Sequence, residues 1–149
     1  MISPHFQLEE FLLGNRNPPQ EATPLLVALC EAVLEPVREW AGCSVVITSG
    51  WRPPAQNAAS GGAKTSQHQW LADAVAVDFT FACDNPKAKL RDCHAWLYAN
   101  PVAGVDQCIL EWADKPDNYR CIHVGWGGKR RGMYGFGSVG NKSSYTWLP

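Results

Sequence analysis

Three residues of this sequence combine the side-chain types of a catalytic zinc site. His68 follows a long polar segment, Asp78 is the only charged residue in the apolar run AVAVDFTF, and His123 lies in the apolar run CIHVGW. A carboxylate in an apolar strand is costly unless it is paired or bound to a cation. Two imidazoles and one carboxylate leave a fourth zinc position open, where the metal activates water and polarises carbonyls. These residues form no His-Glu-x-x-His motif, so on spacing alone surface and packing roles stay open.

The hydrophobic pattern predicts the elements that position these side chains. We expect helices over 5–12, 23–40 and from 85 onward, and strands over 44–48, 74–81, 107–112 and 121–126. Pro36 should bend or interrupt the second helix. Residues 49–67 lack periodicity and form a long loop of the kind that is usually functional. From Gly127 the chain is expected to be irregular. This order indicates one α+β domain over 1–149, with a mainly antiparallel sheet and flanking helices.

Composition limits the class of protein. The chain has 149 residues, of which 46% are hydrophobic and 18% charged, which suits one hydrophobic core. A net charge of −1 gives no electrostatic basis for binding nucleic acid or an anionic membrane. No apolar run is long enough to span a bilayer, and residues 1–10 lack the pattern of a signal peptide. We therefore expect a cytoplasmic protein, and no feature demands an oligomer, so a monomer is expected.

Six cysteines occur without any Cys-x-x-Cys pair, at positions 30, 43, 83, 93, 108 and 121. A structural zinc knuckle is therefore not expected. Several of these cysteines lie in apolar segments, where they are expected to be reduced and buried. A secreted protein held together by disulfides is the alternative, which a count of free thiols under denaturing conditions would reveal.

Six short segments occur in a distinctive order between residue 5 and about residue 130. They are HFQLEEF at 5–11, VLEPVR at 33–38, TSGWRPPAQN at 48–57, GGAKTSQH at 61–68, AVD at 76–78 and HV at 123–124. In this order the segments resemble the M15 family of zinc D-Ala-D-Ala peptidases, particularly its small phage-type members. The resemblance implies a hedgehog/DD-peptidase-like α+β fold with zinc bound by His68, Asp78 and His123.

One departure from the family pattern concerns the carboxylate ligand. The family usually places the aspartate seven residues after the histidine, whereas Asp78 follows His68 by ten. The simplest explanation is a three-residue insertion around 69–73, which makes Asp73 a rival ligand. Asp78 is favoured because it lies in the strand context AVDF, while Asp73 falls within the inserted loop.

The resemblance also suggests the residues that act on the substrate. Glu111 lies in the strand expected to pair with that of His123, and it is the best candidate for the general base. Some relatives place a glutamate three residues before the last histidine, but that position is Arg120 here. Arg52, in the segment SGWR, is expected to stabilise an oxyanion or to grip the substrate.

Three further residues are candidates for substrate binding. Ser66 precedes the first histidine by two residues, although it could equally serve only to turn the loop. Gln107 begins the strand of Glu111. Trp126 flanks the last histidine, where core packing is the alternative role. His5 and His94 are expected to be structural.

The implied activity is hydrolysis of an amide bond near a D-amino acid in bacterial peptidoglycan, as a carboxypeptidase or an endolysin. The partner would be the peptidoglycan stem peptide. A phage or prophage product would be made in the host cytoplasm and act on the wall after release. The alternative function is a non-catalytic wall-binding or virion structural module that retains the peptidase fold.

Overall fold

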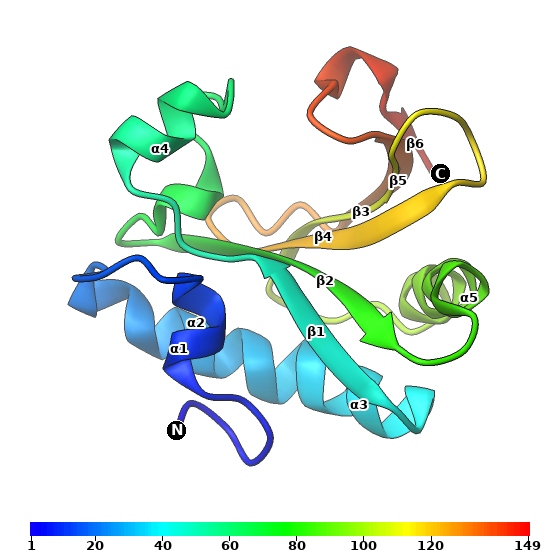
Figure 1. Ribbon diagram of the computed structural model, residues 1–149, viewed down its shortest axis with the longest axis horizontal. Coiled ribbons are helices and arrows are strands. Elements are labelled where there is room, and N and C mark those ends of the chain that lie inside the picture. Colours follow the sequence, from blue (N-terminus) through cyan, green and yellow to red (C-terminus); the bar gives the residue numbers. More distant parts are fainter.

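A six-stranded sheet with the order β1-β2-β4-β3-β5-β6 forms the centre of the structure, a computed structural model that describes residues 1–149 (Figure 1). The strands are β1 Ser44–Ser49, β2 Ala74–Ala82, β3 Val105–Trp112, β4 Tyr119–Gly127, β5 Met133–Ser138 and β6 Thr146–Trp147. Neighbouring strands are antiparallel except for β3 and β5, which are parallel. The predicted α+β class with a mainly antiparallel sheet is therefore confirmed.

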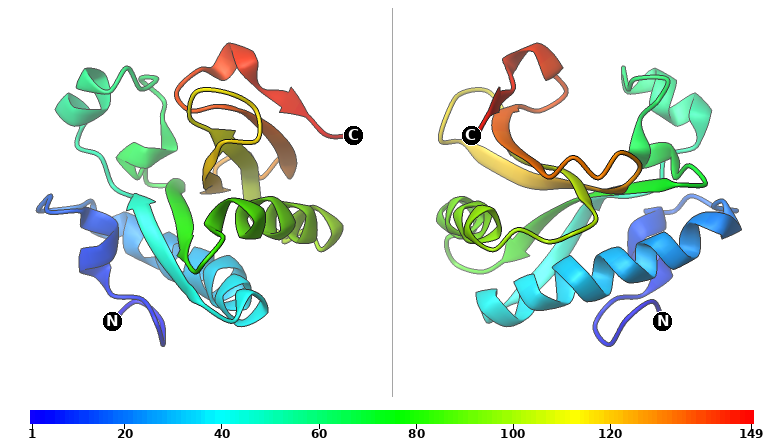
Figure 2. Two further views of the ribbon diagram at one scale, coloured as in Figure 1. Left: turned by 45° about the vertical axis from the view of Figure 1, so that its right-hand side comes forward. Right: turned by 180° about the vertical axis from the view of Figure 1, so that it is seen from behind.

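The helices divide between the two faces of this sheet. They are α1 Leu8–Leu12, α2 Thr23–Leu29, α3 Glu35–Ala41, α4 Pro54–Ala59 and α5 Pro86–Ala99. Helices α1, α2, α3 and α5 cover one face, whereas α4 and the C-terminal segment lie on the other face (Figures 1 and 2). None of the helices has the length and hydropathy that a membrane crossing requires.

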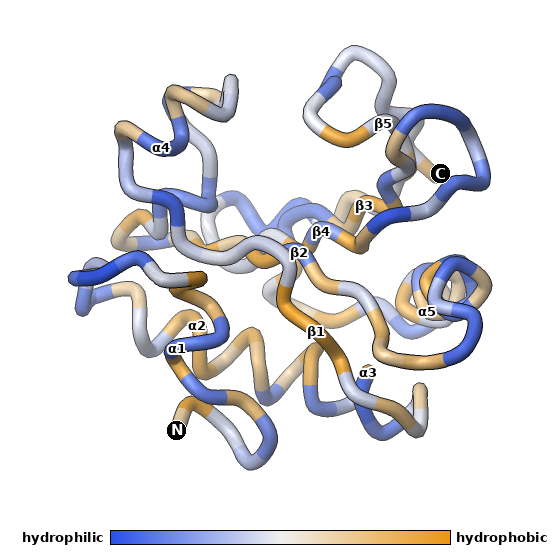
Figure 3. Tube along the Cα trace, viewed as in Figure 1, coloured by the Kyte–Doolittle hydropathy of each residue, from blue (hydrophilic) through white to orange (hydrophobic).

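The core lies between the sheet and the helices beneath it. On β2, Val75, Val77 and Phe79 belong to the buried cluster, together with Leu26 and Leu29 of α2. In Figure 3 apolar colour follows β1 and recurs along the long helix below the sheet. Each fully buried side chain of this size contributes roughly 1.5–3 kcal/mol. Because side chains alternate along a strand, the residues between these positions face the opposite side of the sheet.

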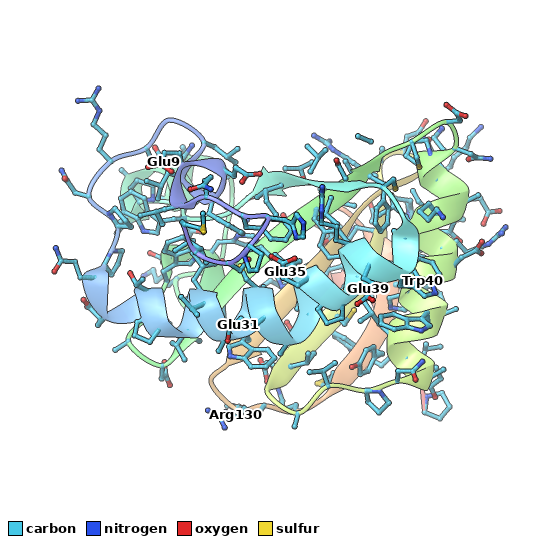
Figure 4. The ribbon with its side chains drawn as sticks, turned by 90° about the horizontal axis from the view of Figure 1, so that it is seen from below. Glu9, Glu31, Glu35, Glu39, Trp40 and Arg130 are labelled. Atoms are coloured by element: carbon cyan, nitrogen blue, oxygen red, sulfur yellow. The ribbon has the colours of Figure 1, made fainter.

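Helices α2 and α3 form one continuous helical segment that passes through Pro36. A π-helical turn, Cys30–Leu34, joins them, and the Glu35 N–H donates to the carbonyl of Cys30. Proline lacks an N–H and its ring crowds the preceding turn, so a locally widened turn accommodates it. The expected interruption is thus a π turn, after which the helix continues to Ala41; Trp40 in its last turn is shown beside α5 in Figure 4.

Two segments expected to be irregular contain regular structure. The loop over 49–67 includes α4, and the short 3-10 turn Gln67–Gln69 follows it. The expectation of an irregular tail from Gly127 was wrong, because β5 and β6 extend the sheet there. Strand β5 was missed because Gly135 and Gly137 alternate with its aromatic residues and make the segment look like a loop, whereas its parallel pairing with β3 defines it as a strand.

Candidate metal centre

Two of the predicted ligands meet on the face of the sheet that carries α4. Asp78 of β2 is directly opposite His123 of β4 in the antiparallel register. Their chain neighbours Val77 and Val124 are core residues, so alternation turns Asp78 and His123 to the other face. Opposed side chains on one face lie about 5 Å apart at Cβ, which brings a carboxylate and an imidazole into contact.

His68 reaches these two residues from the 3-10 turn Gln67–Gln69. The Ser66 hydroxyl accepts the backbone N–H of His68 at 3.3 Å and so caps this turn. The imidazole is buried, and its Nδ1 lies 2.9 Å from the carbonyl oxygen of Gly50. Donation from Nδ1 to this carbonyl leaves the lone pair on Nε2, which faces Asp78 and His123.

The backbone of Gly50 can place its carbonyl oxygen beside His68 because glycine has no side chain to clash with α1. A Cβ at Gly50 would lie 2.1 Å from the carbonyl oxygen of Phe11, which also accepts the N–H of Trp51 at 2.9 Å. Helix α1 therefore closes tightly over the end of β1. The N-terminal segment HFQLEEF thus supports the metal centre through the backbone that carries the acceptor for His68.

The three donor atoms converge. Asp78 Oδ1 lies 2.8 Å from His123 Nδ1 and 3.2 Å from His68 Nε2, and the two nitrogens are 3.3 Å apart. Ligands about 2.0–2.1 Å from a tetrahedral zinc ion are separated from one another by roughly 3.3 Å. Two imidazole nitrogens and one carboxylate oxygen at these separations therefore fit zinc in both chemistry and spacing, and together they form the one group of this kind in the chain.

The electrostatics of Asp78 suit a ligand. Burial raises the pKa of its carboxyl, but the charge and hydrogen bonds of His68 and His123 outweigh burial and hold the pKa below its usual range. Asp78 is therefore ionised at neutral pH. Asp73, the rival in the sequence, is exposed on the turn before β2 and takes no part in the group. The geometry favours Asp78.

Glu111 lies on the same face as the three ligands. It is two positions beyond Ile109 of β3, which is opposite His123, so Glu111 and His123 project to one side. Its carboxyl is buried, and burial together with the negative charge of Asp78 raises its pKa to about 7. The Tyr145 hydroxyl donates to Glu111 Oε2 at 3.5 Å from the C-terminal segment. A buried carboxylate with this pKa can accept a proton near neutral pH.

Arg52 follows the Gly50 acceptor along the chain. Its backbone N–H donates to the His68 carbonyl at 2.7 Å, and its Nε is buried without a hydrogen-bond partner. It lines a cavity of about 240 Å³ with Ser49, Gly50 and Gln56, and it takes part in none of the ion pairs of the structure. A guanidinium without an anionic partner can bind a carboxylate or an oxyanion.

The remaining candidates occupy different surroundings. Gln107 is half-buried on β3 opposite Gly125, on the face of the metal ligands. Ser66 caps the turn of His68. Trp126 belongs to the hydrophobic core cluster, where its ring lies against Gly104. The structure thus does not bring Trp126 together with the other candidates.

An ion pair between the buried Asp106 and the exposed Arg131 was not expected from the sequence. Asp106 is 1% exposed, and Arg131 donates to both of its oxygens, through Nε at 2.9 Å and Nη2 at 2.8 Å. Gln67 Nε2 donates to Asp106 Oδ2 at 2.9 Å. The hydrogen bonds from Arg131 lower the pKa of Asp106, so this carboxylate stays ionised. A charged anchor thus holds the residue that immediately precedes His68.

The side chain of Gln67 packs against β4 at a position where a glycine leaves room for it. A Cβ at Gly125 would lie 2.1 Å from Gln67 Oε1, so the amide rests directly on the β4 backbone. The sequence signal for this contact was weak, since it consists of a lone aspartate at the start of an apolar strand and a glycine within another.

The profile of a protein family described as Peptidase M15 matches residues 4–107 of the chain. The match includes Arg52, His68 and Asp78, while Glu111 and His123 lie beyond its end. No curated protein matches the chain closely enough to serve as a named relative.

Proposed function

The chain belongs to the peptidase M15 family, and on that premise we propose that it is a zinc-dependent hydrolase that cleaves peptide bonds in bacterial peptidoglycan. The observation that carries this proposal is the convergence of His68 Nε2, Asp78 Oδ1 and His123 Nδ1 within 4.8 Å of one another. The ligands come from one face of a sheet and one anchored turn, an arrangement suited to a preorganised site.

Zinc, when bound, would supply a Lewis acid that polarises the scissile carbonyl and activates water for attack. The side chains of the protein supply the remaining chemistry. Glu111 accepts a proton and can return it to the leaving amine, because its pKa of about 7 lies near the working pH. Arg52 binds negative charge on the substrate, and its unpartnered buried Nε supports that role.

The substrate class rests on the motif order rather than on the ligands. The segments SGWR, GGAKTSQH and AVD resemble those of D-Ala-D-Ala peptidases, which favours an amide near a D-amino acid in the stem peptide. Carboxypeptidase and endolysin activities are both of this type. We propose that the protein is made in the cytoplasm of a bacterial host and acts on the wall after release.

A direct test compares two aspartates five positions apart. Wild type, Asp78→Asn and Asp73→Asn are purified, their zinc content is measured by mass spectrometry, and peptidoglycan digests are analysed by mass spectrometry with and without chelator. Wild type and Asp73→Asn are expected to retain zinc and to release the same fragments, whereas Asp78→Asn loses both properties. Chelator should abolish cleavage and added zinc should restore it.

The outcomes separate the possible functions. Full cleavage in chelator would exclude the zinc mechanism. Zinc binding without release of any fragment would instead indicate a non-catalytic wall-binding or virion module. Loss of zinc from Asp73→Asn but not from Asp78→Asn would identify Asp73 as the carboxylate ligand.

A further inference from the structure

Two of the six cysteines flank the end of the β1–β2 pair that lies away from Asp78. Ser44 of β1 is opposite Ala82 of β2. Cys43 immediately precedes Ser44 and Cys83 immediately follows Ala82, so one further step in the same register places the two cysteines opposite each other. Opposed residues in antiparallel strands have Cα atoms roughly 4.5–5.5 Å apart, within the roughly 4.4–6.8 Å found for disulfides.

The two thiols are in contact and differ from the other cysteines in accessibility. The Cys83 thiol lies close enough to Cys43 to raise its pKa, and both residues are half-buried. The other four are buried in the folded protein: Cys30, Cys93, Cys108 and Cys121. Cys43 also lines a surface cavity of about 680 Å³ beside α3. A small reagent can therefore reach this pair while the other cysteines are shielded.

The turns that carry the pair are held together by three contacts between α3 and α5. The rings of Trp40 and Trp96 stack with centroids 5.6 Å apart, and Trp40 is seen beside α5 in Figure 4. Lys89 of α5 donates to the carbonyl of Ala41 at 3.2 Å, and its ammonium lies 5.3 Å from the centre of the Trp40 ring. The proximity of the two cysteines is thus fixed by the fold.

The charges around the pair oppose the effect of burial. Burial raises the pKa of the Cys43 thiol and the Cys83 thiol raises it further, while Lys89 and Arg38 lower it. The net shift is upward, so the thiolate that attacks a disulfide is scarce at neutral pH. Exchange is consequently faster in mildly alkaline solution.

We propose that Cys43 and Cys83 form a site of reversible oxidation, which a low-molecular-weight disulfide such as glutathione disulfide converts to an intramolecular cross-strand disulfide. The thiolate of one cysteine attacks a sulfur of glutathione disulfide and expels one glutathione thiolate. The thiolate of the second cysteine then attacks the protein-bound sulfur of the mixed disulfide and expels the other. The two thiol protons pass through solvent to the two glutathione thiolates, so two cysteine thiols are oxidised and one glutathione disulfide is reduced to two glutathiones.

The disulfide would close a covalent loop of residues 43–83, which contains most of the metal centre. Residues 43–83 include His68 and Asp78 and the carbonyl of Gly50. The bond itself forms at the opposite end of β1, since Asp78 is opposite Ser49 rather than Ser44. Oxidation is therefore expected to stabilise the protein by restricting the unfolded chain, while leaving the metal ligands in place.

The test uses the intact native protein in glutathione buffers of increasing oxidised fraction at pH 8. The reaction is quenched with acid, remaining thiols are alkylated under denaturing conditions, and peptides are mapped by mass spectrometry. We expect a cross-linked peptide that joins Cys43 to Cys83, with the other four cysteines alkylated. Oxidised wild type is expected to melt several degrees above reduced wild type, and reductant should reverse the shift.

Variants separate this pair from general thiol chemistry. Cys43→Ser is expected to give a glutathione adduct on Cys83 without a cross-link and without the rise in Tm. Cys121→Ser, which removes a buried thiol, should retain the cross-link; its identification by peptide mapping does not depend on the stability of the variant. Complete alkylation of both Cys43 and Cys83 after oxidation would overturn the proposal. Stable glutathione adducts on both cysteines, without formation of the Cys43–Cys83 disulfide, would also overturn it.

Discussion

The Nδ1 atom of His68 lies 2.9 Å from the carbonyl oxygen of Gly50, and this contact decides which nitrogen of the imidazole faces the metal centre. The carbonyl cannot donate a hydrogen, so Nδ1 carries the proton and Nε2 is free to bind a cation. The same backbone position is fixed from the other side by Phe11 of α1. The orientation of one ligand thus depends on a helix at the start of the chain.

Gly50→Ala should weaken metal binding through this arrangement. The new Cβ would meet the Phe11 carbonyl at 2.1 Å, so the backbone must move and the acceptor for His68 moves with it. We expect a 10–100-fold loss of zinc affinity, measured by competition with a chromogenic chelator. Gly61→Ala is the control, because its Cβ enters open space. That variant is destabilised by its positive φ but should keep its zinc affinity; an equal loss in both variants would contradict the role of Gly50.

Gln67→Ala should also reduce zinc affinity, because it removes the link from the turn of His68 to Asp106, which is buried and paired with Arg131. We expect a loss of roughly 10-fold or more, measured by the same competition. Gln69→Ala is a matched control on the other side of His68, since its amide bonds only to the carbonyl of Lys64. Equal affinities of the two variants would show that the anchor does not position His68.

Glu111→Gln should suppress turnover without removing the metal. Glutamine keeps the shape of the side chain but cannot accept the proton, and loss of a general base typically costs 10²–10⁴-fold in rate. Zinc content and kcat on a muropeptide substrate are measured on the same preparation. Asp114→Asn alters an exposed carboxylate beyond the end of the same strand and should leave both values unchanged. An unchanged kcat in Glu111→Gln would remove this residue from the mechanism.

The raised pKa of Glu111 has a consequence for stability in the metal-free protein. The folded state binds the proton more tightly, with a pKa of about 7 against the ordinary 4.5, so stability falls as pH rises between these values. The penalty is on the order of 3 kcal/mol once the carboxyl is ionised. In chelator, Glu111→Gln should therefore have a higher Tm than wild type at pH 8 and a similar Tm at pH 5. The same Tm difference at both pH values would contradict the raised pKa of Glu111 in the folded protein.

The sequence predicted those parts of the fold and site that depend on local pattern. The apolar run around Asp78 and the run around His123 formed strands, and their mutual register follows from burying the intervening valines and phenylalanines. The choice between Asp78 and Asp73 was likewise indicated by strand context, and the geometry favours Asp78.

Other parts depend on contacts that no local pattern encodes. Strand β5 alternates the aromatic residues Tyr134 and Phe136 with glycines, and it is defined by its parallel pairing with β3. Trp126 lies on the core side because β4 alternates, although its neighbourhood in sequence suggested a place beside His123. The hydrogen bond from Gln67 to Asp106 joins residues that are far apart in the chain, and neither residue belongs to a recognisable sequence motif.

The order of strands in the sheet also determines how the metal centre responds to fluctuations. Strands β2 and β4, which carry Asp78 and His123, have a paired strand on each side. Backbone amides in such interior strands are expected to exchange with solvent only in the rarest openings of the domain. Asp78 and His123 are therefore expected to hold their positions while the edges of the sheet fray, so the two strands that carry them need not unfold for a cation to enter or leave the site.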